Sequence, residues 1–440
     1  MEDSKIFVIG GGPAGSSAAS FLAMKGHDVT LFEKEKFPRP HVGESLLPFN
    51  YGLFDDLGVL DRMTTTYNRK PGVKFSNSDG SSNTVWYFKD EITGPSSLSF
   101  HVERASFDKM LLDRSKELGV KVYEETPVRG VKFDHNKNQI KVSVQNRDGK
   151  KSVFVGDFII DASGQSTFLA KKLKDKNKYH GLDRVAINSH WLNPKYNKEL
   201  EEGIIEIIHL GGEKMGWIWA IPLSSNKLSV GVVISAKYYK EQRKSLKGEK
   251  NILDKIYNSE LNQSPSMCEI LREAVQEMPA MVHGDYSYYT DKKYGNNYAI
   301  IGDAGAFLDP IFSSGIYVGM MSAKMIARQI DIAIKENLDV EKTLKIAFDD
   351  INGGYDLVEK LIRIFYNPNA IALSKLSELR DKEYEKFHIA YQIYHFLLQG
   401  DFLINHKRYI NGAELLTDMS KFNKFKNLLN PNHKKEIYSS

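Results

Sequence analysis

Cysteine is almost absent from this chain of 440 residues, in which Cys268 is the only one. An internal disulfide is therefore excluded, and a reducing compartment fits the composition. Cys268 lies within the apolar pattern MCEILREAV, which predicts a helix. We expect this thiol to pack against its neighbours rather than to act as a nucleophile.

Other signals are missing as well. No apolar run approaches the length of a transmembrane helix, and a strand pattern begins at Lys5, which leaves no room for a removable secretion signal. We therefore expect no membrane span and a cytoplasmic protein. The histidines form no H-x-H or H-E-x-x-H pair, so we expect no metal site. The net charge of +4 comes from interspersed acids and bases, so we expect no nucleic-acid partner.

The strongest positive signal is a glycine fingerprint near the N-terminus. Glycines in G-x-G-x-x-G spacing lie between a short apolar run and an alanine-rich helical pattern, and a second apolar run ends in an acid about twenty residues later. The residues are Gly10, Gly12 and Gly15, with Ala14 between the last two, and the acid Glu33. This order is typical of a βαβ unit that binds a dinucleotide. The glycines admit the pyrophosphate, the helix N-terminus attracts its charge, and the acid accepts ribose hydroxyls.

The loop after this unit reads KFPRPHVGESLLP and includes Arg39 and Ser45. One interpretation is a surface turn with a helix cap at Ser45. We favour the other, in which the loop folds against the ring or pyrophosphate of the bound cofactor. Arg104, before a later helical pattern, is expected near the same cofactor.

The remaining patterns predict an α/β protein with a two-domain Rossmann-like fold, an antiparallel β-sheet domain and a C-terminal helical region. Alternating apolar residues over 131–155 predict a β-meander, and four more strand patterns occupy 185–191, 203–209, 216–223 and 227–234. A helical insert is expected over 238–278, and a peripheral basic tail from Lys421. The expected nucleotide domain comprises 1–75, 100–168 and 283–340, the sheet domain 76–99 and 169–282, and the helical region 341–440.

Three separated segments carry a family resemblance. The fingerprint, the turn Asp161-Ala-Ser-Gly164 and the segment Gly302-Asp303-Ala304 resemble the FAD-binding fold of para-hydroxybenzoate-hydroxylase-like flavin monooxygenases. The resemblance implies that Asp303 contacts the ribityl chain or pyrophosphate of FAD, and that Glu33 binds the adenosine ribose. Only one dinucleotide fingerprint is present, so no separate NAD(P)H domain is expected.

Within that superfamily the sequence resembles those of flavin-dependent halogenases over about residues 5–370. The motif W-x-W-x-I-P is formed by Trp217, Trp219, Ile221 and Pro222, and PRPHVGESLLP and DPIFSSGI also match. The resemblance implies that FADH2, O2 and chloride or bromide generate hypohalous acid, which reaches a lysine through a channel. It also implies a separate flavin reductase that supplies FADH2. The plainer alternative is that both tryptophans fill a core from one side of a strand.

The family's catalytic lysine is best matched by Lys70 in RKPGVKF, with Lys74 as the competitor. A desolvated lysine suits the task because it can lose its proton. The family's halide-binding pair matches Ser314 and Gly315, where backbone N–H groups at a turn would hold the anion. A simple serine N-cap is compatible with this interpretation.

One departure concerns the substrate. Tryptophan halogenases carry a glutamate just before the halide segment, and Phe312 stands at the matching position. This favours an electron-rich phenol or pyrrole over an indole, and we expect a phenolic, polyketide-like aromatic. Whether the substrate is free or carrier-tethered stays open. Competing hypotheses are a flavin monooxygenase or geranylgeranyl-reductase-like enzyme, and a non-enzymatic FAD- or partner-binding protein.

Overall fold

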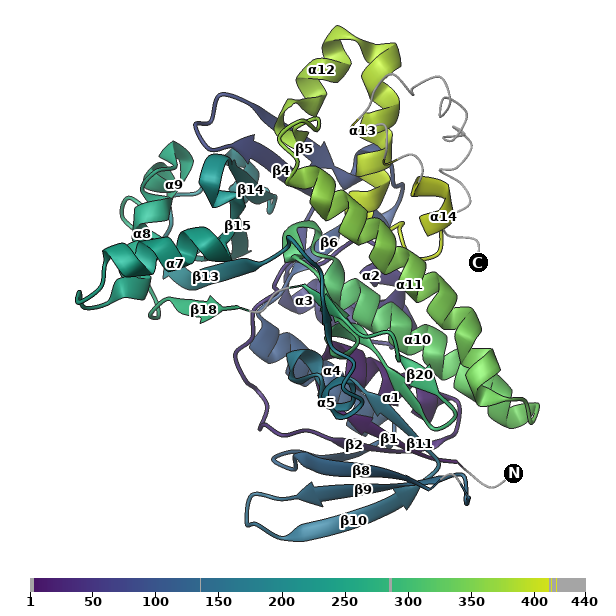
Figure 1. Cartoon of the computed structure of the whole chain (residues 1–440). Helices are drawn as coiled ribbons and strands as arrows, with labels where there is room; N and C mark the ends of the chain where they lie inside the picture. Colours follow the sequence, from purple (N-terminus) through teal and green to yellow (C-terminus); the bar gives the residue numbers. More distant parts are fainter. Residues whose placement is uncertain (1–3, 135, 285–286, 411–412, 414–416, 418–440) are drawn as a thin grey trace.

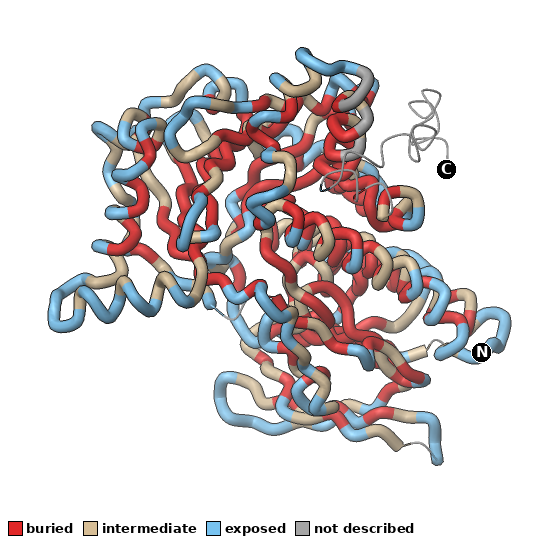
Figure 2. The backbone as a smooth tube through the Cα atoms, turned by 45° about the horizontal axis from the view of Figure 1, so that its top comes forward, coloured by how far each residue is buried: buried red, intermediate tan, exposed pale blue. Residues whose placement is uncertain are grey.

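A computed structural model of the chain describes residues 4–134, 136–284, 287–410, 413 and 417. The basic tail expected from Lys421 lies outside these residues. Figure 1 shows a sheet with covering helices in the lower part, a larger sheet at the upper left, and long helices on the right. Buried backbone runs without a break from one sheet to the other (Figure 2), so both sheets share one interior.

The lower sheet carries the glycine fingerprint and has the strand order β20-β21-β11-β1-β2-β7. Its strands are β1 (Lys5–Ile9), β2 (Asp28–Phe32), β7 (Lys121–Tyr123), β11 (Phe158–Asp161), β20 (Tyr294–Gly295) and β21 (Tyr298–Ile300). All neighbours are parallel except β20 and β21. Helix α1 (Pro13–Met24) packs against α4 (Arg104–Glu117) and α10 (Ser314–Lys335) on one face of this sheet. The predicted βαβ unit is confirmed.

The predicted meander is confirmed as β8 (Val128–Asp134), β9 (Gln139–Gln145) and β10 (Lys151–Gly156), paired in antiparallel order. It covers the other face of the lower sheet. Phe7 and Ile9 of β1 point into the cluster that the meander buries, whereas Ile6 and Val8 point into the main core. The strand is therefore buried on both faces, as its continuous apolar sequence requires.

The larger sheet has the order β17-β13-β16-β15-β14-β4-β5, with β18 also beside β13. Its members are β4 (Gly72–Asn77), β5 (Asn83–Tyr87), β13 (Arg184–Leu192), β14 (Ile205–Leu210), β15 (Gly216–Ser224), β16 (Lys227–Ser235), β17 (Val275–Gln276) and β18 (Met281–His283). The four predicted strands are confirmed. The four pair in antiparallel order, as expected, and the sheet also contains β4, which lies outside the predicted four and runs parallel to β14. The domain boundary expected at residue 75 lies inside β4, which pairs only within this sheet.

Strand β15 separates two cores. Trp217, Trp219 and Ile221 belong to the main core, whereas Ile218 and Ala220 belong to a second core. Helices of the expected insert cover the second core, namely α7 (Ala236–Ser245), α8 (Ile252–Leu261) and α9 (Pro265–Ile270). Cys268 on α9 is exposed, so the packing role expected for it is wrong. The short α9 buries only Met267 and Ile270, three residues apart on its other face.

The C-terminal helical region contains α11 (Val340–Phe365), α12 (Leu376–Lys382), α13 (Tyr384–Gln399) and α14 (His406–Tyr409). Helix α11 packs along α10, and α12 and α13 rise beside β5 (Figure 1). Trp86 of β5 stacks on Tyr391 of α13 with a centroid distance of 4.2 Å. The aromatic residues of this region therefore join helices to the larger sheet.

Short elements complete the structure. They are α2 (Asn50–Asp56), α3 (Leu60–Thr66), α5 (Phe168–Lys172), α6 (Lys198–Glu201), β3 (Asn68–Lys70), β6 (Ser99–His101), β12 (Asn177–Lys178), β19 (Tyr288–Tyr289) and β22 (Ala306–Phe307). Within the described ranges, no helix combines the length and apolar character needed to cross a bilayer. The same ranges hold no cluster of three or more His, Cys, Asp or Glu side chains suited to a metal ion.

Candidate cofactor and halogen-transfer site

The fingerprint glycines differ in what they face. A Cβ at Gly10 would lie 2.4 Å from the Ala162 carbonyl oxygen, and one at Gly15 would lie 1.9 Å from the Gly10 carbonyl oxygen. Both positions are therefore closed to larger residues by packing. At Gly12 the nearest atom is Nη2 of Arg39, 3.7 Å away. Space of this kind, at the N-terminus of α1 and beside a guanidinium, suits a pyrophosphate.

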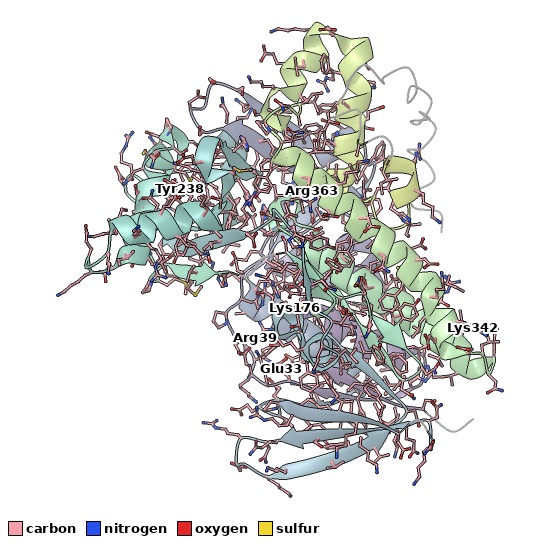
Figure 3. All side chains as sticks on the ribbon, in the orientation of Figure 1. Glu33, Arg39, Lys176, Tyr238, Lys342 and Arg363 are labelled. Carbon is pink, nitrogen blue, oxygen red and sulfur yellow. The ribbon has the colours of Figure 1, made fainter. Side chains whose placement is uncertain are left out.

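Glu33 lies just beyond the end of β2 (Figure 3) and is 4% exposed. Its carboxylate accepts hydrogen bonds from the backbone N–H groups of Gly11, at 2.6 Å, and Glu35, at 2.8 Å. These bonds fix the carboxylate against the glycine turn. Because a carboxylate offers about four acceptor sites, Glu33 retains capacity for ribose hydroxyls.

Two arginines hold the loop that follows. Arg104 forms a bidentate ion pair with Asp108, at 2.8 and 3.0 Å, and donates to the Val42 carbonyl at 2.6 Å. Arg39 donates to the same carboxylate at 3.1 Å and pairs with Glu35 at 2.9 Å. Asp108, which sequence analysis did not single out, thus ties the loop to α4. This arrangement favours a loop held against the fingerprint rather than a free surface turn.

Asp303 lies where the fingerprint meets α10. A Cβ at Gly302 would lie 3.2 Å from Cβ of Ala14, and one at Gly315 would lie 3.8 Å from Oδ1 of Asp303. The carboxylate is half-buried, and burial raises its pKa to about 6, with the charge of Arg104 opposing the shift. No hydrogen bond joins this carboxylate to another described residue. It is therefore available for donors on a cofactor.

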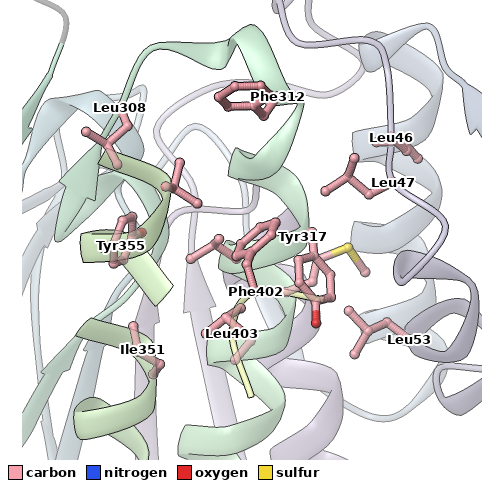
Figure 4. Packing of buried hydrophobic residues seen from close by; sticks show 14 of the residues in the cluster. Leu46, Leu47, Leu53, Leu308, Phe312, Tyr317, Ile351, Tyr355, Phe402 and Leu403 are labelled. Carbon is pink, nitrogen blue, oxygen red and sulfur yellow. The ribbon is translucent and has the colours of Figure 1, made fainter. Parts of the chain in front are cut away.

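The start of α10 offers uncapped backbone donors. Ser313 occupies the N-cap position with a left-handed φ of 55°, and its side chain makes no capping hydrogen bond. The simple serine cap is therefore not formed, and the N–H groups beginning at Ser314 and Gly315 stay free to meet an anion. Phe312, 6% exposed, packs edge-to-face on Phe365 at 6.4 Å. Figure 4 shows Phe312 above α10, with Leu46 and Leu47 on the opposite side of that helix from Leu308.

The two motif tryptophans lie on one side of β15 with their ring centroids 5.5 Å apart. Nε1 of Trp217 donates to Oδ1 of Asp309 at 3.2 Å and to the Tyr366 hydroxyl at 3.1 Å. Nε1 of Trp219 donates to Oγ of Ser229 at 3.1 Å. Sequence analysis assigned no role to Asp309 or Tyr366, although Asp309 is the first residue of the matched segment DPIFSSG.

The last two motif residues, Ile221 and Pro222, lie on the part of β15 that contacts β3, the strand that carries Lys70. Ile221 points into the main core, 6% exposed, and the register of β15 against β16 shifts between Pro222 and Ser224. The Pro222 carbonyl accepts a 2.8 Å hydrogen bond from the Asn68 side chain on β3. This bond fixes the end of the motif against Asn68, which precedes Lys70 by two residues in the sequence.

Lys70 is 2% exposed, and its Nζ donates to the Leu46 carbonyl at 2.8 Å. The ring of Phe88 lies 5.5 Å away, and burial lowers the pKa of the amine to about 7. Lys74 instead contacts carboxylates, with Glu199 at 3.3 Å and Glu206 at 3.7 Å. The geometry thus separates a desolvated amine at Lys70 from an ion-paired one at Lys74.

The candidate residues form two groups. The fingerprint, Asp303 and the start of α10 lie together, whereas Lys70 contacts the Leu46 carbonyl. The tryptophan side of β15 belongs to the same continuous core as Leu46 and Phe312, which links the two groups.

Known proteins resemble the chain throughout this region. The family model described as tryptophan halogenase matches residues 5–89 and 81–370. A tryptophan 2-halogenase from Chondromyces crocatus is 32% identical over 370 residues, which cover 83% of this chain and 68% of that protein. A 1H-pyrrole-2-carbonyl-(peptidyl-carrier protein) chlorinase from Pseudomonas fluorescens is 29% identical over 392 residues, covering 84% and 85%. The solved structure of CmlS, a flavin-dependent halogenase, superimposes with a TM-score of 0.73 at 29% identity and covers 89% of this chain and 72% of that one.

Proposed function

This chain belongs to the flavin-dependent halogenase family, and from that membership we propose that it chlorinates an electron-rich aromatic compound with Lys70 at the point of halogen transfer. The enzyme uses FAD as FADH2, a halide ion and O2. The observation that carries the role of Lys70 is its buried amine, held by one carbonyl and with a pKa lowered to about 7. Near neutral pH such an amine is present in both protonation states.

The residues present fit FAD. The open side of Gly12, the free carboxylate of Asp303 and the fixed carboxylate of Glu33 suit the pyrophosphate, ribityl and ribose groups respectively. Arg39 and Arg104 hold the adjoining loop. Bound flavin supplies one overall conversion, in which FADH2, O2, halide and a proton give FAD, hypohalous acid and water.

The remaining residues would handle the halogen. The free N–H groups at Ser314 and Gly315 would hold the halide without a formal charge. The packed rings of Trp217 and Trp219 would keep the organic substrate away from the flavin. Lys70 would hold hypohalous acid, or carry the halogen on its amine, while the ring of the substrate attacks.

The substrate class follows from Phe312. Its apolar ring leaves no carboxylate at this position to assist a weakly activated ring, so the substrate itself must be electron-rich. A phenolic, polyketide-like compound meets this need. One relative is a chlorinase of a carrier-bound pyrrole, which supports testing carrier-tethered acceptors as well. A separate flavin reductase would supply FADH2.

The test is a reaction of the purified protein with FAD, a flavin reductase, NADH, chloride and a resorcinol acceptor. We expect a product mass with the isotope pattern of chlorine. Replacing Lys70→Ala should abolish this product while FAD binding persists, and Lys74→Ala should retain it. Product formation by the Lys70 variant would contradict the assignment, and gain of oxygen in place of chlorine would indicate hydroxylation.

A further inference from the structure

A row of polar side chains lies beside Lys70. Strand β3 pairs with one edge of β6, where Lys70 faces Ser99 and Asn68 faces His101. The other edge of β6 bridges to Ser45, which also faces His101. Directly opposed residues in paired strands, and residues two apart on one strand, share a face. Five side chains therefore project from the same face, those of Asn68, Lys70, Ser99, His101 and Ser45, and the amide of Asn68 donates to the Pro222 carbonyl.

Ser45 and His101 are particularly close neighbours. The bonds that flank them run from Leu46 N–H to the Phe100 carbonyl, at 3.0 Å, and from Val102 N–H to the Glu44 carbonyl, at 2.8 Å. This pattern defines a non-hydrogen-bonded pair, in which Cα atoms lie about 4.5 Å apart and side chains approach most closely. Because the Lys70 amine reaches the Leu46 carbonyl beyond β6, it ends beside this pair.

The protonation of His101 follows from its partner. Nε2 lies 2.8 Å from the Gly203 carbonyl oxygen, which can only accept, so Nε2 carries the proton. The ring is fully buried, and burial together with the nearby charge of Lys70 lowers its pKa to about 3. The ring is therefore neutral, and Nδ1 is a bare acceptor.

Three polar atoms on this face lack a hydrogen-bond partner among the described residues. They are Nδ1 of His101, Oγ of Ser99 and Oγ of Ser45, all buried. Buried polar atoms are rarely left unpaired, and a small polar molecule usually satisfies them. One acceptor and two hydroxyls thus lie beside the Lys70 amine. None of these three atoms has a role in the mechanism proposed above for Lys70.

We propose that His101, Ser99 and Ser45 form a pocket that holds the hydroxyl group of hypohalous acid beside Lys70, with Nδ1 of His101 accepting its hydrogen bond. This inference rests on the proposed function. A water molecule occupies the pocket between turnovers. Held by its oxygen, the acid presents its halogen to the substrate.

The transfer step balances within this arrangement. The ring carbon forms a bond to the halogen, and the oxygen–halogen bond breaks with its electron pair on oxygen. The leaving hydroxide takes a proton from the Lys70 ammonium and becomes water, and the proton later lost from the ring carbon replaces it. The sum is arene plus hypohalous acid giving haloarene plus water.

Two His101 variants separate this role from a structural one. In His101→Asn the amide reaches about as far as Nδ1, so an acceptor remains in the pocket while the bond to Gly203 is lost. In His101→Gln the amide reaches about as far as Nε2, so the bond to Gly203 remains and the pocket loses its acceptor. The readout is halogenated product per NADH consumed, together with hypohalous acid that escapes and halogenates an added 1,3-diketone.

We expect His101→Gln to lower product per NADH about tenfold, as loss of one hydrogen bond implies, and to raise diketone halogenation, while His101→Asn stays within about threefold of the unmodified enzyme. The proposal is overturned if His101→Gln gives as much product per NADH as the unmodified enzyme, or if only His101→Asn gives less. If the unmodified enzyme halogenates neither acceptor nor diketone, the proposed function fails instead.

If both His101 variants lose FAD binding, Ser99→Ala tests the pocket instead. This variant removes one hydroxyl that has no hydrogen-bond partner among the described residues. We expect less halogenated product per NADH with unchanged FAD binding, and an unchanged yield per NADH overturns the proposal. A high-resolution crystal structure adds a readout independent of activity. We expect an ordered water within hydrogen-bond distance of Nδ1 of His101, and a direct bond from either serine to Nδ1 would contradict the pocket.

Discussion

The hydroxyl of Tyr366 donates a 2.6 Å hydrogen bond to Oδ2 of Asp309. Tyr366 follows the end of α11, and Asp309 precedes α10 by a few residues, so the bond ties two helices together within the core. Burial raises the pKa of Asp309, and Trp217 donates to its other oxygen. The acid thus depends on buried neighbours for all its partners.

Replacing Tyr366→Phe should therefore destabilise the protein by about 1–3 kcal/mol, since Oδ2 of Asp309 loses its donor while staying buried. Urea denaturation measures the change. Tyr87→Phe is the matched control, because that hydroxyl bonds to Glu202 at the surface, and we expect a change within about 0.5 kcal/mol. Equal effects of both substitutions would show that burial at Asp309 does not matter.

Burial of Lys70 should lower the free energy of unfolding at the pH values where this amine is charged in the unfolded chain. Its folded pKa of about 7 lies below its usual 10.5, so the unfolded state binds more protons between these values. Stability therefore rises with pH from about 7 towards 10, and the full penalty is present below 7. Lys70→Met should stabilise the protein more at pH 6 than at pH 9.5, by thermal unfolding at both values. Lys74→Met, which removes two ion pairs, should not stabilise it at either pH.

Halogen transfer should also follow the titration of Lys70. If the neutral amine carries the halogen, product formation under saturating FADH2 should rise with pH through an apparent pKa near 7. Single-turnover reactions with pre-reduced FAD measure this without the reductase. Product formation that instead falls as pH rises through the same value would favour hypohalous acid held by the Lys70 ammonium.

Gly231 gives a direct test of the position of Trp219. The two residues face each other across β15 and β16, and a Cβ at Gly231 would lie 2.1 Å from the indole ring. Gly231→Ala should move the ring, cost about 1–3 kcal/mol and shift the tryptophan fluorescence. Gly130→Ala is the control, because its Cβ would meet nothing closer than 4.0 Å. An unchanged emission spectrum in Gly231→Ala would contradict the packing described.

Asp303 should make FAD binding depend on pH. Without cofactor its pKa is raised to about 6, whereas hydroxyl donors on FAD favour the ionised carboxylate. Binding is thus linked to loss of a proton, and affinity for FAD should increase from pH 5 to pH 7 and then level off. Asp303→Asn should bind FAD about tenfold more weakly at pH 7 and lose most of this dependence. Calorimetric titration at several pH values measures both effects.

Local sequence predicted a large part of this architecture. The glycine turn, α1 and β2 follow from residues within about twenty-five positions, and alternation predicted the meander because adjacent strands pair through short turns. The parallel contact between β4 and β14 could not be predicted, because alternation reveals neither partner nor direction. The exposure of Cys268 was missed because a short helix has too few residues to define a buried face.

The candidate site shows the same limit. The family match favoured Lys70 over Lys74 in RKPGVKF, but the local sequence does not tell which amine is buried. The distant partners Leu46 and Glu206 distinguish a desolvated amine from an ion-paired one. The bridge between Ser45 and His101 joins residues far apart in the chain, so no spacing rule points to it. Side chains that contact through the fold carry no local signal.

The alternation along β15 has a practical consequence for engineering. Positions 217, 219 and 221 contact the interior that the two sheets share, whereas 218 and 220 contact only the core beneath α7, α8 and α9. A library limited to the odd-numbered positions would therefore change side chains in the shared interior while the helix-covered core keeps its own, and a library limited to 218 and 220 would do the reverse. Variation along this one strand can thus be confined to one core at a time.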